Sequence, residues 1–189
     1  MITTLPNPLA RGLAALVSLV VLGLLSGCAS YHLGAPAELP FEAIYIRPAS
    51  NDSFAPQAQA IVSSQLRQQF IRDGRVHLVD NETAADAVLD VNLAEYDRRG
   101  GARRSSDTVV ASDFDISLSA DVSLYISGTG DYLFESRKIA GRTKTYIENP
   151  YAADSALRTQ AYQQSEYQAM PVLARDLARN IADEVLSVW

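Results

Sequence analysis

Four arginines stand close together in one polar stretch of this chain and could bind a phosphate or another anion. Arg98, Arg99, Arg103 and Arg104 flank two consecutive glycines. A planar guanidinium forms paired, charge-assisted hydrogen bonds with phosphate oxygens. The same stretch also fits a flexible polar hairpin that is kept basic for solubility. Both interpretations remain open from the residues alone.

The second chemical feature is Cys28, the only cysteine of the chain. It follows Leu-Ser-Gly at the end of an apolar run over residues 13–25, and Arg11 is the only charge before it. A positive start, an apolar run and small residues at its end are typical of a secretory signal peptide. The order Leu-Ser-Gly-Cys resembles the bacterial lipobox. This resemblance implies cleavage before Cys28 and acylation of that residue.

Lipid on this cysteine would determine how the chain meets a membrane. Several acyl chains anchor firmly, because each buried methylene contributes about 0.8 kcal/mol. We predict a signal peptide over residues 1–27, a lipidated N-terminus and tether over 28–40, and a single α+β domain over 41–189. Ala29, not aspartate, follows the cysteine. By resemblance to enterobacterial sorting, this favours the periplasmic side of the outer membrane.

Residues suited to catalysis or metal binding are scarce. His32 and His77 are the only histidines, and their spacing does not suit a metal pair. No phosphate-binding glycine loop or nucleophile elbow is present in the sequence. Three acids share one face of a predicted strand, where we interpret them as solvated: Asp113, Asp115 and Asp121. We expect no enzyme activity, no metal and no cofactor other than the covalent lipid.

The charge balance of the chain limits its partners. The formal net charge is −6 at pH 7 over the whole sequence. A net acidic chain argues against general nucleic-acid binding, although a local basic patch for an anionic lipid remains compatible with it. Four tyrosines before and within the last predicted helix could pack against a partner or cap the domain's own core: Tyr146, Tyr151, Tyr162 and Tyr167.

The elements that must position these groups are five predicted strands. The clearest alternation of apolar and polar residues runs from Phe114 to Ile126, which indicates a long strand with one buried face and one wet face. Gly128 to Asp131 predicts a hairpin turn, and Gly141 in the returning strand suggests a bulge. The strands are expected at residues 43–47, 76–79, 89–93, 114–126 and 132–147.

Two amphipathic helices complete the predicted fold. Apolar residues at four-residue spacing from Ala58 to Phe70 indicate the first helix, which ends near Gly74. The second covers the C-terminus, where Pro171 either starts the helix or kinks a longer one begun near Ala161. We predict an α+β fold of order β-α-β-β-β-β-α. Both helices pack on one face of a mixed, mostly antiparallel sheet of four to five strands.

Taken in order, these features resemble the lipopolysaccharide-assembly outer-membrane lipoprotein family (LptE-like). The resemblance covers nearly the whole chain after Cys28. It rests on element order and lengths and on the lipobox, not on a catalytic signature. The segments that carry it are Leu25-Ser26-Gly27-Cys28, Tyr31-His32-Leu33, Ala43-Ile44-Tyr45-Ile46, Ile71-Arg72-Asp73-Gly74, Val76-His77-Leu78-Val79-Asp80, Ala85-Asp86-Ala87-Val88-Leu89 and the final helix from Leu177 to Val188.

The resemblance implies a non-enzymatic component that plugs and helps to assemble the lipopolysaccharide-inserting β-barrel, LptD, and that contacts lipopolysaccharide. Lipid A phosphates would then be the target of the four arginines. The family also tends to carry a basic residue where Arg158 stands. The alternative is a lipoprotein adaptor or pilot of another envelope machine, of the secretin or Tol type. An enzyme with an unrecognised site is a third possibility.

Overall fold

Three long antiparallel strands form the centre of the sheet. β7 (Asp113–Ile126) lies between β4 (Ala87–Gly100) and β8 (Tyr132–Tyr146). The apolar positions of β7 from Ile116 to Leu124 are buried, and the alternate positions are more exposed, as the alternation predicts. The computed structural model describes residues 39–101, 103–104, 107–147, 150 and 153–187, and residues 39–189 form one compact unit.

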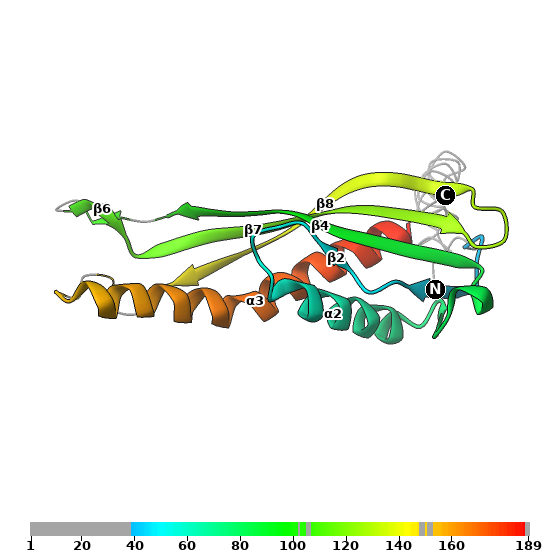
Figure 1. The fold of residues 1–189 in the computed structure, drawn as a ribbon, viewed down its shortest axis with the longest axis horizontal. Coiled ribbons are helices and arrows are strands. Elements are labelled where there is room, and N and C mark those ends of the chain that lie inside the picture. The colour runs from blue at the N-terminus through cyan, green and yellow to red at the C-terminus, as the bar shows by residue number, and fades with distance from the viewer. Residues whose placement is uncertain (1–38, 102, 105–106, 148–149, 151–152, 188–189) are drawn as a thin grey trace, which may run out of the picture. The chain divides into compact units, whose positions relative to one another are not determined.

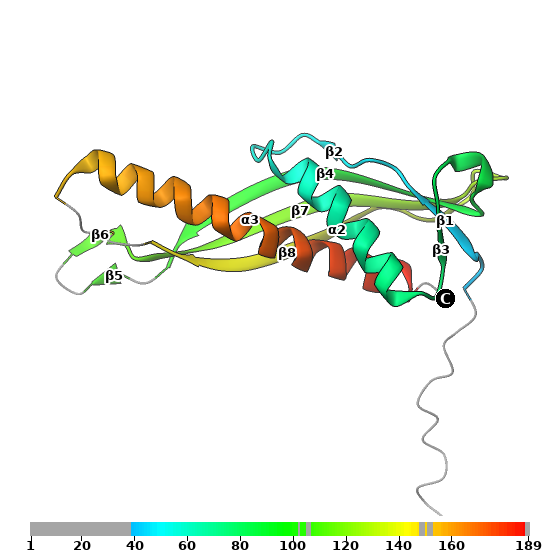
Figure 2. The ribbon, with the colours of Figure 1, turned by 90° about the horizontal axis from the view of Figure 1, so that it is seen from below.

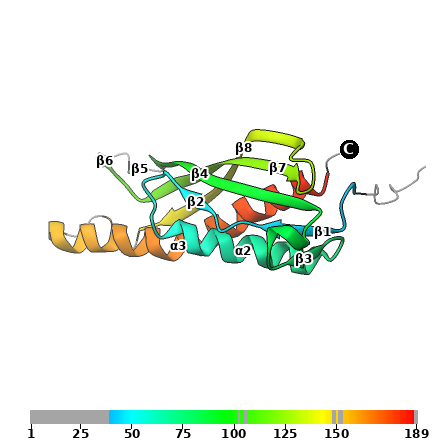
Figure 3. The same ribbon diagram turned by 45° about the vertical axis from the view of Figure 1, so that its right-hand side comes forward.

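The remaining strands extend the sheet on the far side of β4. β1 (Ala43–Ile46) pairs with β4 and with β3 (His77–Val79), both times in parallel. The two-residue strand β2 (Ser50–Asn51) follows β1 along the same edge of β4 (Figure 3). The sheet therefore has six strands, in the order β3-β1-β4-β7-β8 with β2 also on β4. Two further short strands, β5 (Arg103–Arg104) and β6 (Asp107–Ala111), pair with each other.

Both helices cover the same face of the sheet, as predicted (Figure 1). α2 (Ala58–Asp73) connects β2 to β3 and buries Ala58, Val62, Leu66 and Phe70. It ends at Gly74, whose φ of 74° is readily adopted only without a side chain. Between β3 and β4 the chain forms a short 3-10 turn, η2 (Glu82–Ala84). The α+β class is thus confirmed, with six strands in the main sheet where four to five were expected, and with the separate pair β5–β6.

The C-terminal helix is longer than its apolar stripe indicated. α3 spans Ser155–Val185, and its N-cap Asp154 accepts a hydrogen bond from the backbone N–H of Ala156. Pro171 lies inside this helix, which changes direction along its length (Figure 1). From residue 169 onward α3 crosses beneath the sheet beside α2 (Figure 2) and buries most of its apolar side chains. Its first three turns bury very little.

Gly141 marks a close approach of helix and sheet, not the bulge that we predicted. A Cβ atom at this position would lie 2.6 Å from the backbone nitrogen of Leu177 in α3. The ladder between β7 and β8 is regular at Gly141 and shifts near Ser136, whose φ is 47°. No helix in the described part of the chain is long and apolar enough to cross a membrane.

Candidate functional site

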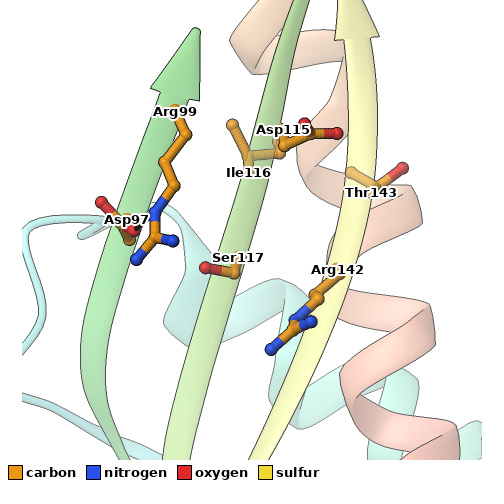
Figure 4. A pocket seen from close by; sticks show the side chains of 7 residues that line it. All are labelled: Asp97, Arg99, Asp115, Ile116, Ser117, Arg142 and Thr143. Carbon is orange, nitrogen blue, oxygen red and sulfur yellow. Dashed lines mark hydrogen bonds and ion pairs between the residues drawn. The ribbon is translucent and has the colours of Figure 1, made fainter. Parts of the chain in front are cut away.

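A polar cleft lies on the sheet where the three long strands run together. The ladder places Asp97 opposite Ser117, and Ser117 opposite Arg142. Two residues further along each strand, the same ladder aligns Arg99, Asp115 and Lys144. Basic and acidic side chains therefore lie side by side across the strands. The cleft has a volume of about 440 Å³ and is lined by Asp97, Arg99, Asp115, Ile116, Ser117, Arg142 and Thr143 (Figure 4).

Most cations of this surface already have a carboxylate partner. Arg99 Nε lies 2.7 Å from Asp97 Oδ2, although the Arg99 side chain is 82% exposed. Lys144 Nζ lies 3.4 Å from Asp113 Oδ2 and 3.5 Å from Asp115 Oδ1. The hydrogen bond with Asp113, followed by the charge of Asp115, raises the pKa of Lys144 above its ordinary value. Lys144 is consequently protonated, and the carboxylates of Asp113 and Asp115 balance its positive charge.

Arg142 differs from these cations. Its guanidinium forms no ion pair with any residue that the structure describes, and only its backbone N–H is engaged, donating to Asp176 Oδ2 at 2.9 Å. Two arginines from the outer strands thus line one cleft, with the Ser117 hydroxyl on the strand between them. This combination suits an oxyanion, because a guanidinium binds phosphate or carboxylate oxygens in pairs.

Arg98 lies on the opposite face from this cleft. Its Nη1 is 2.9 Å from Glu166 Oε2 of α3, and its guanidinium lies 5.8 Å from the ring centre of Phe114. The Tyr96 hydroxyl donates to the same carboxylate. Burial, and then this hydrogen bond, raises the pKa of Tyr96 above its usual range. Arg98 and Tyr96 therefore join the sheet to α3.

The predicted arginines are divided among three elements of the structure. Arg98 and Arg99 belong to strand β4, and Arg103 and Arg104 form the separate strand β5, so all four lie in strands. Arg158 lies in the first turn of α3, on the helix-covered side, where its backbone N–H donates to the Asp154 carbonyl oxygen. Cys28, the predicted lipid attachment, lies outside the described residues. Sequence reasoning did not single out Arg142, because its position depends on strand register.

The acidic and aromatic candidates also separate into buried and exposed side chains. Asp113 was expected to be solvated, but it is only 5% exposed because Gly101 packs over its carboxylate, whereas Asp115 is exposed. Tyr162 packs edge-on against Phe114 at 5.1 Å and so covers the domain's own interior. Tyr146 and Tyr167 are 71% and 68% exposed, and Tyr151 lies outside the described residues. The described residues contain no cluster suited to a metal ion.

Comparison with known proteins agrees with this architecture. Residues 41–184 match the sequence model of the family described as "LptE: Lipopolysaccharide-assembly". The structure is similar to a hypothetical protein, CT253, from Chlamydia trachomatis, with a TM-score of 0.51 and 11% identity over 78% of this chain and 96% of the other. It also matches uncharacterized lipoprotein B from Nitrosomonas europaea, with a TM-score of 0.46 and 17% identity over 82% and 90% of the two chains. No curated protein matches by sequence.

Proposed function

Since this chain belongs to the lipopolysaccharide-assembly family LptE, we propose that it partners and plugs an LptD-type β-barrel and aids lipopolysaccharide delivery to the cell surface. The observation that carries the proposal is the family match, which runs from the start of the sheet to the end of α3. The family consists of non-enzymatic lipoproteins. Anchoring through Cys28 on the periplasmic side of the outer membrane belongs to the same proposal.

We infer that the cleft between Arg99 and Arg142 contributes to lipopolysaccharide contact. Lipid A phosphates are oxyanions, and Arg142 forms no ion pair with a carboxylate of the described residues, although Asp97 and Asp115 also line the cleft. Arg103 and Arg104 follow on from the strand that carries Arg99 and remain candidates for the same ligand. Arg98 is a weaker candidate, because Glu166 already neutralises it. Arg158 would need a separate contact on the helix side.

Co-purification from native membranes in mild detergent tests the proposed partnership. The expected result is recovery of an LptD-type barrel with the tagged, lipidated chain. Recovery of a secretin or Tol-type component in its place would support the alternative adaptor role. A Cys28→Ser chain should fold and leave the membrane fraction, and the mass of the mature N-terminus should show an acylated Cys28 in the parent protein.

Lipopolysaccharide binding is tested with paired arginine variants of the purified chain. Changing Arg99→Gln together with Arg142→Gln should weaken binding on the order of tenfold, because exposed charge-assisted contacts contribute less than shielded ones. Arg72→Gln with Arg179→Gln is the matched control, since it removes the same charge from exposed helix positions. Equal binding by both double variants would refute the role of the cleft.

A further inference from the structure

One edge of β4 is paired along only half of its length. β1 pairs with Ala87–Leu89, and β2 pairs with Asn92–Leu93. The last hydrogen bond on this edge runs from the Asp52 N–H to the Leu93 carbonyl oxygen at 2.9 Å. Beyond it, no strand of the described chain pairs with the segment from Glu95 to Gly100 on this side. We call this segment the free β4 edge.

The backbone groups of the free β4 edge can be assigned from its hydrogen bonds. The Gly101 N–H donates to the Asp113 carbonyl oxygen on the β7 side. Because hydrogen bonding alternates along an antiparallel strand, the peptide groups of Tyr96, Arg98 and Gly100 point away from β7. The Arg98 N–H donates at 2.9 Å to the carboxylate of its neighbour Asp97, which fits an outward direction. The edge thus presents the backbone N–H and C=O groups of these three residues to another strand.

The two outer strands of the sheet, β8 and β3, are less open to a further strand. On β8, the Arg142 N–H donates to Asp176 and the Ala140 carbonyl oxygen accepts from Asn180, both at 2.9 Å, so α3 side chains cap the middle of that strand. β3, at the opposite end of the sheet, has only three residues. Short and capped edges resist addition of a further strand. The free β4 edge is six residues long, and among the described residues the only side-chain cap on its outward-pointing groups is the Asp97 carboxylate, which accepts from the Arg98 N–H.

An exposed aromatic side chain lies in the loop after β2, the strand that pairs with β4 just before the free β4 edge. Phe54 is 95% exposed and lies three residues after the end of β2. Its segment is held on both sides, because Ser53 N–H donates to Asn51 Oδ1 and Asn51 Nδ2 donates to the Ala55 carbonyl oxygen, each at 3.0 Å. Asn92 Nδ2 of β4 further donates to Asp52 Oδ2 at 2.8 Å. A pre-positioned aromatic residue is a common anchor of protein interfaces.

We propose that an extended segment of the barrel partner adds as a strand along the free β4 edge, with an apolar side chain of that segment against Phe54. The inference rests on the proposed function. An extended strand is the occupant because β2 already pairs with β4 in this row, and a partner strand would continue the same ladder past Leu93. The hydrogen bond from the Arg98 N–H to the Asp97 carboxylate must then break when the strand binds.

Hydrogen exchange on the complex purified from native membranes tests this proposal. Amides of Tyr96, Arg98 and Gly100 should exchange about tenfold more slowly in the complex than in the chain alone, whereas amides already bonded to β7 should change little. Unchanged exchange of the three edge amides in an intact complex would overturn the strand addition and leave the partnership standing. If no barrel co-purifies, the proposed partnership itself fails.

Matched variants provide a second readout. Gly100→Pro removes an edge N–H and should reduce barrel recovery on the order of tenfold, whereas Gly100→Ala keeps that N–H and should not. Phe54→Ala should weaken recovery similarly, while Ile71→Ala, another exposed apolar position at 67% exposure, should not. Equal recovery by Gly100→Pro and Gly100→Ala, with both chains folded, would contradict the proposal.

Discussion

Gly141→Ala is expected to destabilise the domain because α3 passes directly over this glycine. The added Cβ would lie 2.6 Å from Leu177 N, 2.7 Å from Leu177 Cβ and 2.8 Å from Leu177 Cα. Two of these atoms belong to the helix backbone, so no side-chain rotation relieves the overlap and helix and sheet must separate. Overpacking of this kind costs about 1–3 kcal/mol, and the lower chain entropy of alanine offsets about 0.4–1 kcal/mol of that.

The net loss is therefore about 0–2.6 kcal/mol, and its middle value of about 1.3 kcal/mol corresponds to a fall in Tm of roughly 3–5 °C for a domain of this size. Urea and thermal unfolding of the domain measure it. Gly128→Ala is the control, since nothing lies within 4 Å of a Cβ at that turn position. If Gly141→Ala proved as stable as Gly128→Ala, the close contact between α3 and β8 would be refuted.

Three other predictions concern the core, the acid range and the anchor. Leu118→Asp should abolish cooperative thermal unfolding, because Leu118 is fully buried and an unpaired buried charge costs several kcal/mol; Ser119→Asp, on the wetter face, should shift Tm only slightly. Hydrogen bonds from the backbone N–H groups of Ala43 and Glu42 lower the pKa of Asp86, so its stabilisation is present above the ordinary carboxyl pKa and is lost as pH falls through the lower folded value. The Tm advantage of the parent over Asp86→Ala should accordingly shrink on acidification. Cell fractionation should find Cys28→Ser released from membranes that retain the parent chain.

The repeating patterns of the sequence were sufficient to predict the central architecture. The alternation along β7 correctly identified its buried face, and four-residue spacing identified the buried stripe of α2. β2 was missed because two residues cannot display a period. The first turns of α3 were missed because they bury almost nothing and therefore carry no apolar stripe. The extension of β4 through Arg98 and Arg99 depends on pairing with β7, which local composition does not reveal.

The candidate site was less predictable because it depends on register across three strands. Arg99 was identified from local clustering, but its neighbour in the cleft, Arg142, is far away in sequence. Their alignment follows from the hairpin between β7 and β8 and from the ladder shift near Ser136. The burial of Asp113 likewise depends on Gly101 packing over it, a tertiary contact with no local signal.

The sequence separation between paired elements has a consequence for the proposed export of the chain. β1 is made first, yet its partners are β3 and β4, which follow only after α2. The last turns of α3, from Leu173 to Val185, pack against β7, β8 and α2 and complete the shared core. Non-local contacts of this kind form late and slow folding. If the chain is exported as proposed, its core would be completed only after α3 has crossed the membrane.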